Sequence, residues 1–395
     1  VGAGSVRVTH TASGKLGVAP LSVVPTSVTK SEWTILVFLN AANDLYLFSG
    51  PNMNQMERVA SNSNVRFVVQ WKQSQSVFGN SSFDGTRRYL VQSDNSSAVV
   101  SPVVQDMGSG VDMGSPDTLR QFIDWGVRNY PAKRFALVIW NHGSGWNRDG
   151  ATRAVSYDDE LGTVIQTWQL PQALAGYRFD ILAWDASLMQ MLEVAHEIKE
   201  HAIYVAGSQE SPPGDGYPYD LVFQGFRDDP FASTANLSKG FVDGMLNYPP
   251  FATRKITQSV IETAKLPALA TAVDSLAAEM IANRTDVLEA ATLARDTAQS
   301  YSPSSLRYYR DLIDYVSILR NSGKIPQSVA DAALNVENAA RNALVWEGHN
   351  ANSPKSNGIA IDTTPGSKFS IFAPDYRRMK FASDTRWDEW LLVSP

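Results

Sequence analysis

The sequence predicts an α/β fold built around a mainly parallel sheet. Apolar runs at 33–39, 65–71 and 135–140 are bounded by polar residues, as is typical of strands buried on both faces. The run at 181–184 also stops abruptly at polar residues, and an apolar pattern with helical spacing follows it at 188–198. A strand that leads into a helix in this way is typical of a parallel sheet, and such sheets bind ligands outside the carboxyl ends of their strands.

The elements of the first half follow in the order that this fold requires. After the first strand, the pattern predicts a short helix at 53–60, the strand at 65–71 and another strand at 87–92. Ser115 is placed to cap the next helix, with Pro116 at its first helical position. The apolar face of that helix recurs at helical spacing, at Leu119, Phe122, Ile123 and Val127.

Three segments are predicted along the chain. Residues 1–32 are rich in Ser, Thr, Val and Gly without helical period, which fits an N-terminal extension or pro-segment laid over the surface and equally a partly ordered linker. Residues 33–250 form the α/β domain, which ends at a pair of prolines. Residues 251–395 form a mostly helical C-terminal domain with late strands. Its predicted helices lie at 268–282, 286–299 and 327–345, and its predicted strands at 356–361 and 369–372.

Composition narrows the classes of function. The chain has 395 residues, 44% hydrophobic and 19% charged, which is ordinary for a globular protein of two domains. No run of about 18 apolar residues appears, so we expect no membrane span. The net charge of −6 carries no basic footprint for nucleic acid. The absence of cysteine excludes disulfides and thiolate metal sites. Because the first residue is Val1, we expect a processed, secreted or extracytoplasmic protein whose signal peptide is not visible.

Chemically active residues follow two of the predicted strands. His142 and Gly143 come after the run at 135–140, and Asp185 and Ser187 come after the run at 181–184. If these strands are neighbours, a base and a nucleophile meet at one edge of the sheet. The backbone N–H groups of Gly143 and Ser187 are then candidates to hold an oxyanion, because a glycine lets its N–H approach a carbonyl closely.

These residues carry a resemblance. The His142–Gly143 pair and the stretch Asp185, Ala186, Ser187 resemble the His-Gly and Asp-Ala-Cys motifs of the clostripain-like cysteine peptidases, in the clan of caspases, gingipains and legumains. The segment 209–219 resembles the family's Ser-Gln-Glu…Gly-x-Gly-Trp-Pro-Tyr loop, with Tyr217 in place of the usual Trp. The resemblance implies a caspase-like α/β/α sandwich. It departs from the family at Ser187, where the nucleophilic cysteine belongs.

The resemblance also implies a substrate class and site roles. It indicates an endopeptidase that cleaves protein or peptide substrates after Arg or Lys, through a His/Cys dyad and a covalent acyl-enzyme, with no cofactor required for the chemistry. His142 is then the general base and acid, and Asp185 lies at the base of the pocket for the basic side chain. Asp215 is a second candidate for that charge, and Ser208 and Gln209 line the pocket. No Asn or Asp is placed by the sequence to orient His142.

Simpler readings of the same residues stay open. Ser187 and Asp185 are also typical helix N-cap residues. A thiol with a pKa of ~8.5 is activated readily by histidine, whereas a hydroxyl needs a stronger base, so we expect the Ser187 protein to be nearly inactive. Ser187 is either an engineered replacement or natural. The alternatives are a natural non-catalytic pseudopeptidase that binds basic peptides and, least favoured, a genuine serine peptidase.

Two features of the resemblance fall between the motifs. Some relatives bind calcium, and Asp158 and Asp159, followed by Glu160, are candidate ligands, although three acids in a loop are more often simply solvated. Many relatives also cut themselves after a basic residue between the histidine and the nucleophile. The polar stretch there predicts self-cleavage between Arg153 and Ala154, and less favourably after Arg148, which lies six residues from His142.

Overall fold

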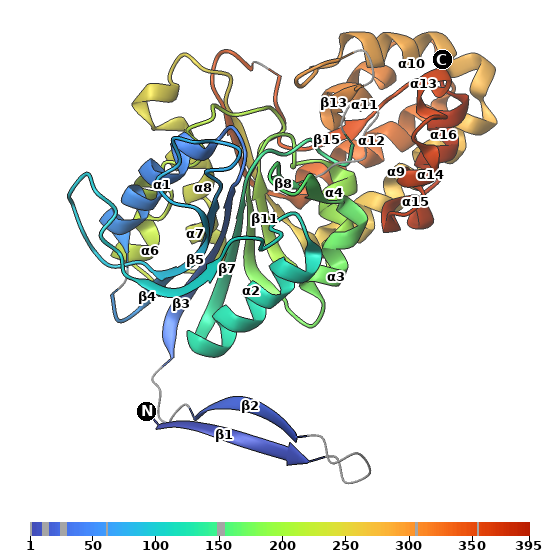
Figure 1. Cartoon of the computed structure of the whole chain (residues 1–395). Helices are drawn as coiled ribbons and strands as arrows, with labels where there is room; N and C mark the ends of the chain where they lie inside the picture. Colours follow the sequence, from blue (N-terminus) through green and yellow to red (C-terminus); the bar gives the residue numbers. More distant parts are fainter. Residues whose placement is uncertain are drawn as a thin grey trace.

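A single large sheet organises the protein (Figure 1). The computed structural model describes residues 2–9, 16–23, 30–60, 62–147, 155–304, 307–353 and 355–395. Within these ranges the sheet has nine strands in the order β14-β12-β11-β10-β7-β3-β4-β5-β6. The five central strands run parallel, and two antiparallel strands complete each edge. The parallel strands are β3 (Ser31–Ala41), β4 (Val65–Gln73), β7 (Ala132–Trp140), β10 (Phe179–Asp185) and β11 (Ala202–Gly207); the edge strands are β5 (Gly85–Leu90), β6 (Val103–Gly108), β12 (Thr257–Glu262) and β14 (Leu344–His349).

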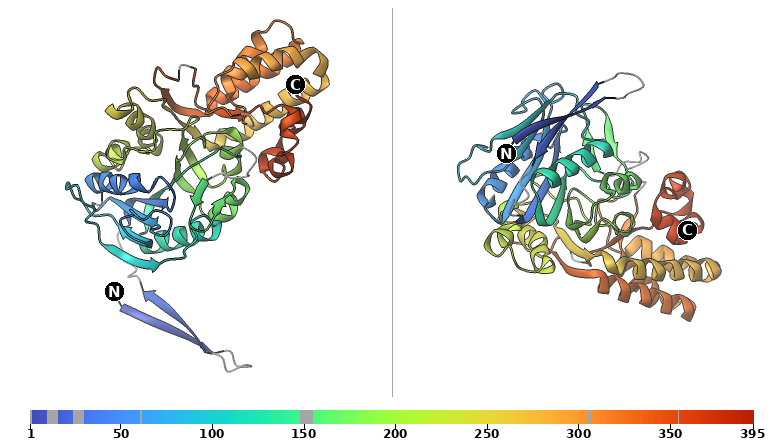
Figure 2. Two further views of the ribbon diagram at one scale, coloured as in Figure 1. Left: turned by 45° about the horizontal axis from the view of Figure 1, so that its top comes forward. Right: turned by 90° about the horizontal axis from the view of Figure 1, so that it is seen from below.

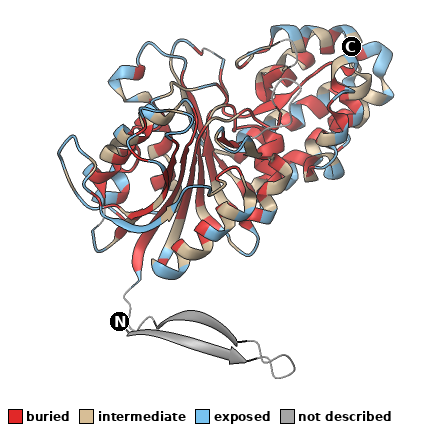
Figure 3. Ribbon diagram, in the orientation of Figure 1, coloured by how far each residue is buried: buried red, intermediate tan, exposed pale blue. Residues whose placement is uncertain are grey.

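Helices cover both faces of this sheet, which confirms the predicted α/β/α sandwich. Strand β3 is buried at every position, and its side chains alternate between two cores. Leu36 and Phe38 pack with the helices on one face, and Ile35 and Val37 with those on the other. Buried positions follow the sheet through the middle of the molecule (Figure 3). One face carries α1 (Tyr46–Val59), α5 (Tyr219–Val222), α6 (Gln224–Asp228), α7 (Thr234–Ser238) and α8 (Gly240–Leu246); the other carries α2 (Pro116–Asn129), α3 (Leu170–Leu174) and α4 (Leu192–Glu197).

Local signals explain several boundaries. Helix α2 begins at Pro116, and the hydroxyl of Ser115 accepts a hydrogen bond from the backbone N–H of Asp117, as the sequence predicts. Helix α4 differs from the prediction, because it begins only at Leu192. Leu188 has a left-handed φ of 65°, and the backbone N–H groups of 188 and 190 donate to the carbonyls of 210 and 208. The chain after β10 therefore runs beside the 208–210 segment before it turns into the helix.

The C-terminal part is mostly helical, as predicted, and stands at one side of the sandwich (Figure 2). The sheet nevertheless crosses the predicted boundary after residue 250, since β12 and β14 pair with β11 and with each other. The strand predicted at 369–372 is wrong. Phe369 and Phe372 are buried and Ile371 is 67% exposed, which is a helical spacing. The helices are α9 (Leu266–Ala282), α10 (Arg284–Thr297), α11 (Leu312–Asn321), α12 (Gln327–Ala343), α13 (Gly366–Phe369), α14 (Ala373–Tyr376), α15 (Lys380–Asp384) and α16 (Trp387–Val393).

Small strand pairs complete the described chain. Strands β1 (Gly2–Thr9) and β2 (Leu16–Val23) form an antiparallel hairpin within the predicted N-terminal extension and pair only with each other among the described strands. Strand β8 (Val155–Asp158) pairs with β9 (Thr163–Ile165), and β13 (Tyr309–Asp311) pairs with β15 (Ala360–Asp362). In the part of the chain that the structure describes, no helix has the length and apolar character that crossing a bilayer requires.

Candidate active site

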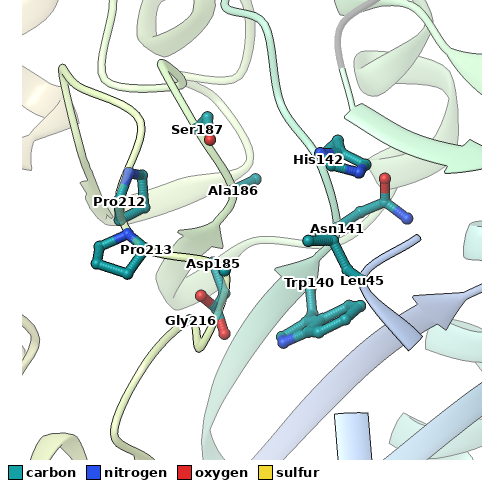
Figure 4. Close-up of a pocket in the computed structure, with 11 residues that line it drawn as sticks. Leu45, Trp140, Asn141, His142, Asp185, Ala186, Ser187, Pro212, Pro213 and Gly216 are labelled. Carbon is teal, nitrogen blue, oxygen red and sulfur yellow. The ribbon is translucent and has the colours of Figure 1, made fainter. Parts of the chain in front are cut away.

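The two predicted motifs meet at the carboxyl ends of β7 and β10. These strands are parallel neighbours, with Trp140 opposite Asp185, and the backbone N–H of Asn141 donates to the carbonyl of Asp185 at 3.1 Å. His142 and Ser187 each follow two residues later. Figure 4 shows their side chains on opposite sides of one opening, with Asp185 below them. The sheet therefore brings together residues that lie 45 positions apart in the sequence.

Gly143 lies directly against the backbone of Ser187. A Cβ atom built at position 143 would lie 2.3 Å from the carbonyl oxygen of Ser187 and 3.0 Å from its amide nitrogen. Both approaches are to backbone atoms, which a rotamer change cannot relieve. The close packing of these two strand ends thus requires glycine after His142.

Ser187 is not a helix cap. Its side chain is half-buried, and among the described residues its hydroxyl has no hydrogen-bond partner. The residue at the N-cap of α4 is Met191, four positions further on, and it makes no side-chain cap. The capping alternative for Ser187 is therefore wrong, and the hydroxyl is left exposed to the opening beside His142.

Asp185 is a buried carboxylate held by neutral donors. Its Oδ1 accepts a 2.9 Å hydrogen bond from the backbone N–H of Tyr217, and its Oδ2 accepts one of 2.9 Å from the hydroxyl of Tyr219. Burial raises the pKa of Asp185 to about 7, while these two hydrogen bonds act in the opposite direction. No lysine or arginine of the described chain forms an ion pair with it. Because its oxygens bind the 217–219 segment, Asp185 is not a helix cap either.

A small cavity lies between the side chains of His142 and Ser187 and reaches down to Asp185. It has a volume of about 170 Å³, and its walls include Trp140, His142, Asp185, Ser187 and Pro213. Gly216 closes the cavity beside the carboxylate. It has a left-handed φ of +68°, and a Cβ there would lie 2.9 Å from both oxygens of Asp185. The cavity is thus a slot that ends on an unpaired buried carboxylate next to Ser187 (Figure 4).

The other proposed substrate-binding residues lie elsewhere. Asp215 is exposed and is not among the residues that line the cavity. Ser208 is buried and donates to the carbonyl of Glu210 at 2.9 Å. Gln209 is buried against the C-terminal part, where its Nε2 donates to Asp311 and its Oε1 accepts from Ser356. In this structure Ser208 and Gln209 hold the 208–210 segment in place instead of lining the slot.

A second cavity also borders His142 and Ser187. It measures about 450 Å³, and its lining includes Asp44, His142, Ser187 and, from the C-terminal part, Arg307. There the carboxylate of Asp44 accepts a 2.5 Å hydrogen bond from Nε2 of His142. The sequence offered no partner for His142. The single signal for Asp44 is its place in the polar stretch that ends the first strand, the same edge at which the two motifs were expected.

The residues proposed for calcium do not form a metal site. Asp158 is buried, and its carboxylate already binds Nζ of Lys72 at 2.7 Å and the backbone N–H of Met113. Lys72 also reaches Glu160 at 2.8 Å, while Asp159 is exposed. The described residues contain no group of three His, Cys, Asp or Glu side chains that could hold a metal ion. Since Lys72 neutralises the carboxylate of Asp158, these residues do not fit calcium.

The structure does not describe the residues predicted for self-cleavage. Arg148, Arg153 and Ala154 lie outside the described residues. The described chain resumes at Val155, which forms an isolated antiparallel bridge with Gly143.

Comparison with known proteins identifies the family. A model of the Clostripain family, peptidase family C11, matches residues 37–392. Clostripain from Hathewaya histolytica is 25% identical over 225 residues, which cover 48% of this chain and 41% of that protein. The match thus spans about two fifths of the length of this curated relative.

Solved structures show the same fold. The X-ray structure of an inactive zymogen C11 protease from Parabacteroides distasonis has a TM-score of 0.68 at 18% identity and covers 92% of this chain and 99% of that one. A secreted C11 cysteine protease from Bacteroides thetaiotaomicron, in complex with an irreversible peptide inhibitor, has a TM-score of 0.67 at 21% identity and covers 90% of this chain and 99% of that one. Because the family match covers most of the residues, including both motifs, the chain belongs to the Clostripain family of cysteine peptidases.

Proposed function

We propose that this chain is an endopeptidase scaffold for cleavage after Arg or Lys, nearly inactive because Ser187 occupies the nucleophile position. The observation that carries the proposal is the slot beside Ser187 that ends on the buried, unpaired carboxylate of Asp185. A buried carboxylate without a cation is costly, and a substrate guanidinium or ammonium group would offset that cost. The carbonyl of such a residue would then lie beside position 187.

The chemistry follows from the two strand ends. With a thiol at position 187, His142 takes the proton from sulfur, and the thiolate attacks the scissile carbonyl. The N–H groups of Gly143 and of residue 187 hold the resulting oxyanion. His142 then gives the proton to the leaving amine, and water hydrolyses the thioester. A serine hydroxyl is far less acidic than a thiol, whose pKa is ~8.5, so the first step is slow in the Ser187 protein.

The experiment is Ser187→Cys, assayed on chromogenic peptides that end in Arg or Lys. Thiol-dependent hydrolysis is expected, and Asp185→Asn in that background should reduce it by about two to four decades, since removing one partner of a buried ion pair costs ~3–5 kcal/mol. Asp215→Asn should cost less, because Asp215 is exposed. Preference for neutral peptides would contradict the assignment of the slot. Strong activity of the Ser187 protein itself would favour a serine peptidase.

Self-cleavage is part of the proposal. The Ser187→Cys protein should split between Arg153 and Ala154 into two fragments that stay associated, because β7 and β10 pair across the cut. The Ser187 protein should run as one band near 43.3 kDa. Adding Arg153→Ala should slow the split, and the second fragment should begin at Ala154. A fully active but unsplit thiol variant would contradict this step.

A second candidate function follows from the same slot. A natural pseudopeptidase would bind basic peptides without cutting them, and it is favoured by an intact Asp185 pocket beside a missing thiol. A Ser187→Cys protein that binds arginine peptides and stays inert would support this reading.

We also propose a secreted location, supported by the structural neighbour that is described as secreted.

A further inference from the structure

His142 is held on two sides, by a side chain from the loop after β3 and by one from β8. The Asp44 carboxylate accepts a 2.5 Å hydrogen bond from Nε2, and the ring of Tyr157 lies edge-on to the imidazole with centroids 5.9 Å apart. His142 itself is about one third exposed, with 36% of its side chain accessible. The pair faces the same polar cavity that Ser187 lines.

Buried asparagines fix the loop that carries Asp44. Asn40 and Asn43 both donate to the carbonyl of Tyr157, at 3.1 and 3.0 Å. Asn141, next to His142, donates to that carbonyl at 3.1 Å and to the carbonyl of Asn40 at 2.7 Å. The loops that carry Asp44 and His142 are therefore joined to each other and to Tyr157 of β8 through one set of buried hydrogen bonds. A carboxylate on such an anchored backbone is placed, unlike one at the tip of a free loop.

We propose that Asp44 is a positioning residue for His142, so that the machinery is an acid–base–nucleophile triad instead of a dyad. Because Nε2 donates to Asp44, Nδ1 is the ring nitrogen left to accept the proton of the group at position 187. The negative charge of Asp44 also stabilises the imidazolium that forms when that proton moves. This inference rests on the proposed function, since it assigns a role within the same site.

The exposure of Asp44 sets the size of the effect. Its side chain is 71% accessible, so water screens its charge. We therefore expect about a tenfold contribution to rate, well below the roughly 10⁴-fold contribution of a buried triad aspartate. An interaction of this size is measurable in single variants.

The first test needs no activity. In the Ser187 protein labelled with ¹⁵N-histidine, the Nε2 proton of His142 should be visible and protected from exchange with water. Asp44→Ala should remove that signal. Asp159→Ala is the matched control, because Asp159 lines the same cavity and makes no described contact with His142. An unchanged signal in Asp44→Ala, or its loss in both variants, would overturn the role.

The second test measures the nucleophile without a peptide substrate. In Ser187→Cys, alkylation of the single thiol by iodoacetamide should slow about tenfold on adding Asp44→Ala, and acetate should restore part of the rate. The Asp159→Ala control should show neither effect. An unchanged or faster rate in Asp44→Ala would overturn the proposal, a faster rate marking Asp44 as a latch. The proposal would also be overturned if adding His142→Ala to the Ser187→Cys protein left the alkylation rate unchanged. If alkylation behaves as expected but no arginine peptide is cut, the proposed function fails and the triad stands.

Discussion

Tyr219 donates a 2.9 Å hydrogen bond to Oδ2 of Asp185, at the closed end of the slot beside Ser187. The backbone N–H of Tyr217 donates a hydrogen bond to the other carboxylate oxygen, Oδ1. Each carboxylate oxygen thus accepts a hydrogen bond from a neutral donor, and these donors bring no positive charge to balance the ionised carboxylate. The charge of Asp185 depends on pH near neutrality, because burial raises the pKa of this carboxyl to about 7.

Binding of an arginine side chain should strengthen as pH rises through this pKa. Below about pH 7 the carboxyl of Asp185 is mainly protonated, and the apparent affinity falls with the ionised fraction. We expect acetyl-arginine amide to bind the Ser187 protein about a hundredfold more weakly at pH 5 than at pH 8, measured by calorimetry. Acetyl-citrulline amide, which has the same shape without the charge, should show no such dependence. Equal arginine affinity at both pH values would count against Asp185 as its partner.

Tyr219→Phe should weaken that binding while leaving the fold intact. The lost hydrogen bond stabilises the ionised carboxylate, and hydrogen bonds to charged groups contribute about 1.5–3 kcal/mol. We expect an about 7- to 80-fold loss of arginine affinity at pH 7, because the pKa of Asp185 rises from about 7, and the pH at which the affinity is half-maximal should rise with it. Tyr217→Phe is the matched control, since the Tyr217 hydroxyl donates to the carbonyl of Trp184 and does not touch Asp185. Equal losses in both variants would indicate general loosening of the pocket.

The sequence predicted the centre of this fold because its signals are local. The apolar runs of β3, β7 and β10 and the Ser115–Pro116 cap are visible within a few residues. Strands β12 and β14 were missed. Their polar and alternating residues become strand only by pairing with β11 and with each other. The delayed start of α4 depends in the same way on contacts with the distant 208–210 segment.

The candidate site shows the same division. The two motifs could be placed together from the sequence, because parallel strands end at one edge of a sheet. Asp44 could not be assigned, since 98 residues separate it from His142 and nothing local reports their contact. The pairing of Asp158 with Lys72 could not be predicted either, because the two residues lie 86 positions apart on different strands. An ion pair between strands of two different sheets leaves no local signal in the sequence.

Gly143→Ala should destabilise the protein and disturb the site together. Its methyl group would lie 2.3 Å from the carbonyl oxygen of Ser187, so one strand end must move. Overpacking of this kind costs about 1–3 kcal/mol, measured as a lower free energy of unfolding. Gly79→Ala is the control, because a Cβ at that position meets nothing within 4 Å. A Gly143→Ala protein as stable as the control would mean that the two strand ends are further apart than described.

Glu193→Gln should make the protein less sensitive to alkaline pH. Glu193 is fully buried on α4, and burial, followed by the nearby charge of Asp362, raises its pKa to about 8. Its Oε1 accepts from the backbone N–H of Asp362 and from the Tyr376 hydroxyl, and a glutamine oxygen can do the same.

The sign follows from proton binding. Between the unfolded pKa of about 4.3 and the folded value of about 8, the native state binds more protons than the unfolded state. Stability from this residue is therefore greatest below about pH 4, falls as pH rises, and levels off above about pH 8. At ~1.4 kcal/mol per pKa unit the loss is at most about 5 kcal/mol.

Urea unfolding at pH 5, 7 and 9 should show a smaller decline in the free energy of unfolding for Glu193→Gln than for the parent protein. Glu289→Gln, on the exposed face of α10, should keep the parent's decline. Identical declines in all three proteins would show that Glu193 is ionised at no cost in the folded state.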